Sequence, residues 1–122
     1  MKNILLVEDE GALANILVNK LTQMGFTMKF ANNGQEGLQM ALNDHPDLIL
    51  LDIIMPVMDG MTMLQKLRSD SWGKKVNVML LTNLSDPNKI NESKELGVSD
   101  YLIKSDWTLE DIVTAVSKKM EK

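Results

Sequence analysis

The strongest constraint on the fold is a short apolar run in the middle of the chain. Leu48-Ile49-Leu50-Leu51 places a large aliphatic side chain at every position and ends at Asp52. Because side chains of a strand point alternately to its two faces, a strand formed here is apolar on both faces. Such a strand is typical of the centre of a parallel sheet that is covered by helices on both sides.

Similar apolar runs alternate with amphipathic helical patterns along the whole chain. The sequence predicts strands at Lys2–Val7, Thr27–Ala31, Leu48–Leu51, Val76–Thr82 and Asp100–Lys104. It predicts helices over Gly11–Met24 and Asn33–Asn43, from Asp59 or Gly60 to about Arg68, from Asp86-Pro87 to Gly97, and after Thr108. Five strand–helix units in strict alternation predict an α/β fold, in which a parallel sheet carries helices on both faces.

Several residues mark the expected ends of helices. Gly25 fits a left-handed position after the first helix, and Asp86 fits an N-cap with Pro87 as the first helical residue. Thr108 and Asp111 have the spacing of a capping box at the start of the last helix.

The helical patterns also predict which side chains face the core. The first helix has an apolar stripe of Leu13, Ile16, Leu17, Leu21 and Met24. The fourth helix has few apolar residues for the core, since only Ile90 and Leu96 are large and apolar. This favours a helix that is weakly held to the rest of the fold. Thr27–Ala31 alternates weakly around Lys29, which is typical of an edge strand.

Composition excludes several classes of protein. The chain has 122 residues, which fits one domain over 1–122 with nothing left for an output domain. It has no cysteine and one histidine, which excludes disulfide scaffolds, thiolate metal sites, cysteine nucleophiles and multi-histidine metal sites. A net charge of −4 argues against direct binding of nucleic acid. With no signal peptide and no run of about 20 apolar residues, the expected location is the cytoplasm, away from the membrane.

Charged and hydroxyl side chains follow the predicted strands at one edge of the sheet. Glu8 and Asp9 follow the first strand, Asp52 the third, Thr82 the fourth and Lys104 the fifth. In open α/β sheets, ligands bind beyond the carboxyl ends of the strands. We therefore expect three carboxylates, one hydroxyl and one ammonium group to meet at this edge.

Three clustered carboxylates need a cation. Two unit charges at 4 Å repel by about 4 kcal/mol at an effective dielectric constant of 20, and one lysine is too little to offset three such charges. Oxygen ligands with open water positions suit Mg²⁺ better than Ca²⁺, and Mn²⁺ is the alternative ion. A magnesium site with Lys104 and Thr82 beside it suits a phosphoryl group, which makes Asp52 a candidate nucleophile.

At this point the motifs match a family. The chain resembles the receiver domain of bacterial two-component response regulators, the CheY-like fold, over essentially its whole length. The motifs that carry the resemblance are Leu6-Val7-Glu8-Asp9-Glu10, the highly specific run from Leu50 to Gly60, Leu80-Leu81-Thr82 and Asp100-Tyr101-Leu102-Ile103-Lys104. The resemblance implies a flavodoxin-like, doubly wound sheet with strand order 2-1-3-4-5.

The resemblance also implies a role for each matching residue. Asp52 would accept phosphate from a phosphohistidine. The expected ligands of Mg²⁺ are Asp9, Asp52, the backbone carbonyl of Ile54, and Glu8 through a water. Lys104 would pair with the phosphoryl oxygens, Thr82 would move to hydrogen-bond them, and Tyr101 would turn inward. This switch would repack the face of the fourth helix, fifth strand and fifth helix.

The resemblance also implies partners, but it does not identify the downstream process that the protein controls. The expected donors are a sensor histidine kinase or a histidine phosphotransfer protein, and a downstream target protein would bind the switched face. The chain would catalyse only its own phosphorylation and dephosphorylation, so it is not expected to be an enzyme. Alternatives are a phosphorelay intermediate and a binding module that acts without phosphorylation.

Two residues depart from the family pattern. Ser105 follows Lys104 where the family usually has a cis-proline. Because a cis bond to a non-proline residue costs about 3–4 kcal/mol, we expect a trans bond and a shifted loop. Asn83 follows Thr82 where the family commonly has Ala or Gly. It is expected to crowd or hydrogen-bond the phosphoryl site and to alter the rate of phosphorylation or hydrolysis.

Two other functions fit the sequence less well. An aspartyl-phosphate hydrolase of the haloacid-dehalogenase type carries a second Asp two residues after the nucleophile, where this chain has Ile54. A flavodoxin-like electron carrier needs a loop for the flavin phosphate, which Glu8-Asp9-Glu10 would repel. His45, Trp72 and Asp59 are expected to be structural: His45 lies away from the site, Trp72 packs near the third helix, and Asp59 caps it.

Overall fold

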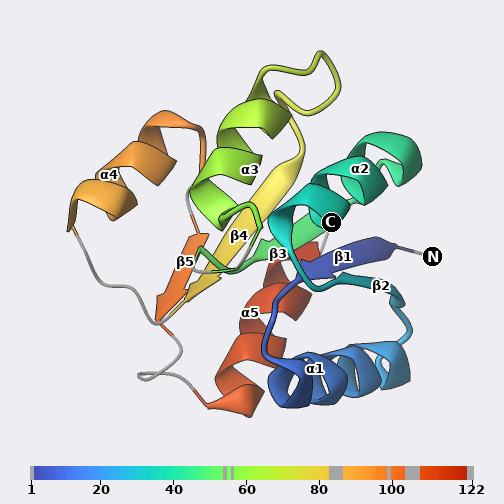
Figure 1. Cartoon of the computed structure of the whole chain (residues 1–122). Coiled ribbons are helices and arrows are strands. Elements are labelled where there is room, and N and C mark those ends of the chain that lie inside the picture. Colours follow the sequence, from blue (N-terminus) through green and yellow to red (C-terminus); the bar gives the residue numbers. More distant parts are fainter. Residues whose placement is uncertain are drawn as a thin grey trace.

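The computed structural model describes residues 2–53, 55, 57–82, 87–98, 100–103 and 108–120. Within these ranges five strands alternate with five helices (Figure 1). They are β1 (Asn3–Val7), α1 (Gly11–Gln23), β2 (Thr27–Ala31), α2 (Gly34–Asp44), β3 (Leu48–Leu51), α3 (Gly60–Arg68), β4 (Asn77–Thr82), α4 (Pro87–Glu95), β5 (Asp100–Ile103) and α5 (Leu109–Met120). The predicted alternation is confirmed.

The strands form one parallel sheet in the order β2-β1-β3-β4-β5, which confirms the order that the resemblance implied. The chain steps from β1 outward to β2 and then returns past β1 to β3. Since crossover connections are right-handed, this reversal places helices on both faces of the sheet. Figure 1 shows α1 and α5 on one face and α2, α3 and α4 on the other.

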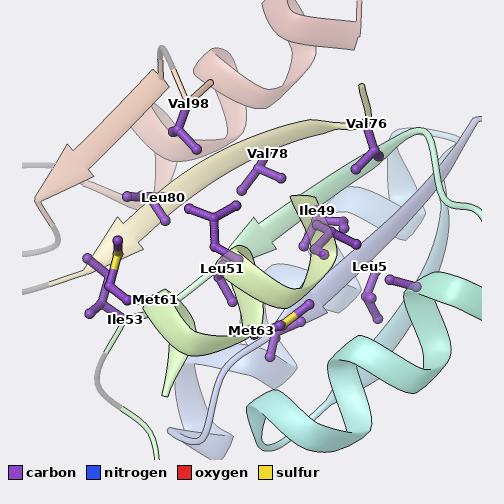
Figure 2. Packing of buried hydrophobic residues seen from close by; sticks show 14 of the residues in the cluster. Leu5, Ile49, Leu51, Ile53, Met61, Met63, Val76, Val78, Leu80 and Val98 are labelled. Atoms are coloured by element: carbon purple, nitrogen blue, oxygen red, sulfur yellow. The ribbon is translucent and has the colours of Figure 1, made fainter. Parts of the chain in front are cut away.

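Two apolar layers hold the helices to the sheet. Strand residues of odd number in β1 and β3 pack against α2 and α3, and their neighbours of even number pack against α1 and α5. Figure 2 shows the first layer, in which Leu5, Ile49 and Leu51 face Met63 of α3. All four residues of β3 are buried, so the interpretation of Leu48–Leu51 as a central strand apolar on both faces is confirmed.

The helix ends follow the predicted local chemistry. The N–H of Asp111 donates to Thr108 Oγ1 at 3.1 Å, and the N–H of Thr108 donates to Asp111 Oδ2 at 3.0 Å, which completes the capping box. Gly25 has a φ of 100° directly after α1, as expected of a left-handed residue at a helix end. Pro87 is the first residue of α4, while Asp86 lies outside the described residues.

The prediction for the buried face of α1 is wrong at two residues. Ile16 is 48% exposed and Met24 is 46% exposed, whereas Ala14, Leu17 and Leu21 are buried. Ile16 is one residue before Leu17 and therefore lies about 100° around the helix from the buried face. Met24 lies beyond the last helical residue, where the chain turns away through Gly25.

The edge strand lies where the sequence predicts it, and two strands begin one residue later than predicted. β2 is an edge strand, and its Lys29 pairs with Asp44 of α2 at 3.0 Å. Lys2 and Val76 lie outside the strands that were predicted to begin with them. Among the described helices, none is both long and apolar enough to cross a membrane.

Glycine is required where α3 begins under the end of β3. A Cβ added at Gly60 would lie 2.1 Å from the backbone oxygen of Asp52 and 2.8 Å from Cα of Ile53. The N–H of Gly60 also donates to the carbonyl of Ile53 at 2.7 Å. The helix therefore starts in direct contact with the backbone that carries Asp52.

Replacing Gly60 with alanine should destabilise the protein by about 1–3 kcal/mol, because backbone atoms cannot move aside as a side chain can. Gly11→Ala is the matched control, since nothing lies within 4 Å of a Cβ added at Gly11. That substitution should be neutral or stabilising by up to about 1 kcal/mol. Urea unfolding of the two variants measures the difference, and equal midpoints would contradict this interpretation of Gly60.

Candidate functional site

The carboxyl ends of β1 and β3 bring two acidic residues side by side. Val7 lies opposite Leu51 in the parallel register, so the next residues, Glu8 and Asp52, leave the sheet together. The N–H of Asp52 donates to the carbonyl of Val7 at 3.0 Å, and the N–H of Glu8 donates to the carbonyl of Ala31 at 3.0 Å. Backbone hydrogen bonds of the sheet thus fix the positions of both side chains.

Glu8, Asp9 and Asp52 form one group, which we call the acidic cluster. One carboxylate oxygen from each residue lies within 4.8 Å of the others. Glu8 is fully buried and Asp52 is 6% exposed, whereas Asp9 is exposed. The cluster therefore has two buried carboxylates and one that is open to solvent, and the predicted convergence of the three at one edge of the sheet is confirmed.

The chain that leads into α1 holds the buried carboxylate in place. The N–H of Glu10 donates to Glu8 Oε2 at 3.0 Å, and Glu10 is the N-cap residue of α1. Glu8 thus lies at the positive end of the helix dipole, where a negative charge is favoured. Its side chain is oriented by backbone atoms only two residues away, which sequence reasoning did not foresee.

The connection from β3 to α3 is held against both neighbouring elements. The N–H of Gly34, the first residue of α2, donates to the carbonyl of Met58 at 3.0 Å. Val57, directly before Met58, has a φ of 68°. This left-handed conformation costs a β-branched residue about 1–2 kcal/mol. Of the described residues after Asp52, Ile53 and Met58 are therefore hydrogen-bonded to the first residues of α3 and α2, and Val57 has a strained backbone.

The donor set of the acidic cluster fits a hard divalent cation. Carboxylates this close repel one another by roughly 4 kcal/mol per pair at 4 Å and an effective dielectric constant of 20. The three groups offer only oxygen atoms, and the open side at Asp9 leaves room for water. These features match Mg²⁺, which is bound through a few carboxylates and retains several waters.

The remaining predicted site residues are described only in part. Thr82 is the last residue of β4 and lies opposite Ile103, the last residue of β5. Four predicted residues lie outside the described part of the chain, as does the side chain of Thr82, so the predictions for them stay untested. The four are Ile54, Asn83, Lys104 and Ser105. Tyr101 is half-buried and packs against the same apolar layer as Val98.

The residues predicted to be structural lie where expected. Asp59 Oδ1 accepts from the N–H of Thr62 at 2.8 Å as the N-cap of α3. His45 lies before β3, at the edge of the sheet opposite the acidic cluster. It stacks on Trp72 with ring centroids 4.3 Å apart. The sequence did not predict this stack, because no pattern links two isolated aromatic residues so far apart in the chain.

Comparisons with known proteins agree with this geometry. Residues 4–117 match the model of the response regulator receiver domain. The chain is 34% identical to "Probable transcriptional regulator ycf27" of Porphyridium aerugineum over 99% of this chain, and spans about half the length of that relative.

Solved structures show the same fold. Vibrio cholerae chemotaxis protein CheY4 matches with a TM-score of 0.87 and 27% identity, over 97% of this chain and 98% of that one. The Mn²⁺-bound form of response regulator Rcp1 matches with a TM-score of 0.82 and 28% identity, over 97% of this chain and 91% of that one. The chain belongs to the response regulator receiver domain family.

Proposed function

We propose that the protein is a phosphorylation-dependent signalling switch in which Asp52 accepts the phosphoryl group. The observation that carries the proposal is the place of Asp52 in a receiver domain. Its carboxylate is nearly buried at the end of β3, within 4.8 Å of the carboxylates of Glu8 and Asp9. The donor would be the phosphohistidine of a sensor histidine kinase or of a histidine phosphotransfer protein.

In the proposed reaction, a carboxylate oxygen of Asp52 attacks the phosphorus atom and the bond from phosphorus to the histidine nitrogen breaks. The nitrogen keeps the electron pair of that bond, and the product is an aspartyl phosphate. Bound Mg²⁺ would neutralise charge on the phosphoryl oxygens and so lower the barrier. Asp9 and Asp52 would hold the ion directly, and the buried Glu8 would act through a water.

The roles of the other site residues rest on the resemblance. Lys104 would pair with the phosphoryl oxygens, and the backbone carbonyl of Ile54 would complete the metal site. Thr82 would move toward the phosphoryl group, and Tyr101 would turn inward behind it. The energy difference between two packings of α4, β5 and α5 would then depend on phosphorylation, and a downstream protein would bind the favoured packing.

The proposed activity is a signalling role. Receiver domains are signalling modules, so the chemistry proposed here is limited to the phosphorylation and dephosphorylation of Asp52. Mn²⁺ is a suitable substitute for Mg²⁺, as the Mn²⁺-bound form of Rcp1 illustrates for a structural relative.

Incubation with acetyl phosphate and Mg²⁺ should add one phosphoryl group to the wild-type protein, as measured by intact mass. Asp52→Asn should gain none, because an amide is a poor nucleophile. Asp59→Asn is the matched control: it removes a carboxylate from the same loop, and asparagine still caps a helix. Equal phosphorylation of wild type and Asp52→Asn would overturn the assignment.

Removing a carboxylate from the acidic cluster should weaken the binding of Mg²⁺. We expect Asp9→Asn to raise the Kd by at least about tenfold, since one charged oxygen ligand is lost. Glu10→Gln, one residue further along, should leave the Kd within about twofold, because its carboxylate is outside the cluster. Calorimetric titration measures both values.

The effect of Mg²⁺ on thermal stability tests the same metal site independently. Mg²⁺ binds the folded state and relieves repulsion, so it should raise the melting temperature of the wild type but much less that of Asp9→Asn. An equal rise in both proteins would place the ion elsewhere and contradict the proposed metal site.

A further inference from the structure

Arg68, the last residue of α3, makes hydrogen bonds that no sequence pattern indicates. Its Nε donates to the carbonyl of Leu96 at 2.7 Å. Its Nη1 donates to the carbonyls of Gly73 at 2.7 Å and Val76 at 2.8 Å. One guanidinium group therefore ties together the end of α3, the segment before β4 and the segment after α4.

The acceptor near α4 is the carbonyl of Leu96, which lies directly after the last residue of the helix. α4 ends in a Schellman motif, in which Val98 N–H donates to the carbonyl of Ser93 and Gly97 N–H donates to that of Lys94, both at 3.0 Å. Gly97 has the positive φ, 83°, that this motif requires. The carbonyl of Leu96 is the one that accepts from Arg68.

The environment of Arg68 makes this contact specific. Burial lowers the pKa of Arg68, but an arginine side chain stays protonated in a protein. A half-buried charged donor forms stronger hydrogen bonds than a neutral one, and the planar fork of a guanidinium fixes their directions. A lysine has a single donor nitrogen, so it cannot replace the separate Nε and Nη1 donors from which these bonds extend.

The two ends of α4 differ in how deeply they are buried. Near the C-terminal end, Ser93 is 1% exposed and Leu96 packs on the apolar layer that covers β4. Val98 belongs to the same layer (Figure 2). At the N-terminal end, Pro87 and Asn88 are exposed. Figure 1 shows the helix at the margin of the molecule, beside α3.

We propose that Arg68 makes the C-terminal end of α4 the fixed end of the helix, about which its N-terminal turn moves. In a parallel α/β fold each helix begins at the carboxyl edge of the sheet, so the moving end of α4 is the end nearer the acidic cluster. Arg68 acts as a positioning residue at the opposite edge. The inference rests on the proposed function for its role in signalling, although the anchoring itself is a property of the unphosphorylated chain.

Amide hydrogen exchange measures this difference along the helix. In the unphosphorylated wild type, the amides of Leu96, Gly97 and Val98 should exchange at least about tenfold more slowly than those of Asn91 and Glu92. Arg68→Gln should speed exchange at the first three amides by at least about tenfold, because a charged donor is lost. The amides of Asn91 and Glu92 should change by less than about twofold, because openings at the N-terminal end of α4 leave the bonds of Arg68 intact.

Two further variants separate the anchor from a simple effect of charge. Lys66→Gln removes a positive charge from the same turn of α3, where Lys66 is exposed, and should leave the exchange of all these amides unchanged. Arg68→Lys keeps the charge but lacks the fork, so it should also lose protection at Leu96–Val98. Full protection in Arg68→Lys, or an equal increase at Asn91 and Glu92 in Arg68→Gln, would overturn the proposal.

Phosphorylation supplies the second arm. With acetyl phosphate and Mg²⁺, exchange in the wild type should change at Asn91 and Glu92 and stay within about twofold at Leu96–Val98. A larger change at Leu96–Val98 would show that the C-terminal end is not fixed. A protein that takes up no phosphoryl group would refute the proposed function, while exchange in the unphosphorylated variants would still decide whether Arg68 is the anchor.

Discussion

The site depends on the parallel pairing of β1 with β3. Because Val7 lies opposite Leu51, the two strands end together and release Glu8 and Asp52 at adjacent places. A register shift of one residue would turn Asp52 to the other face of the sheet and separate the two carboxylates. The apolar layers on both faces of β3 prevent such a shift, since any other register would bury a charge or expose the core. Packing of the core and geometry of the acidic cluster are thus one constraint.

The acidic cluster gathers like charges at a place where several backbone contacts converge. Glu8 is held by the N–H of Glu10 at the start of α1, and Gly60 brings α3 against the backbone of Asp52. Val57, which lies between Asp52 and Gly60 in the chain, has a left-handed φ of 68°. Backbone hydrogen bonds keep Glu8 and Asp52 close together, so a bound cation would lower the repulsion between the carboxylates. At the other edge of the sheet, Arg68 holds α4 by its far end.

Much of this architecture was predictable because it depends on local or periodic patterns. The strands follow from apolar runs, the capping box at Thr108 from its spacing, and the convergence of Glu8, Asp9 and Asp52 from their places after strands. The strand order came from the family resemblance. Ile16 was misplaced, because an apolar pattern wider than the buried face does not identify its edge. The bonds of Arg68 were not predictable, since they end on backbone carbonyls, which carry no signal in the sequence.

The most direct test of the account is chemical identification of the phosphorylated residue. Reduction of the phosphorylated protein with borohydride converts an aspartyl phosphate to homoserine, which peptide fragmentation locates in the sequence. We expect homoserine at position 52 and an unmodified Asp at position 9, because Asp52 follows the central strand β3 and is nearly buried, whereas Asp9 is exposed. Homoserine at position 9 or at position 59, with Asp52 intact, would contradict the central claim.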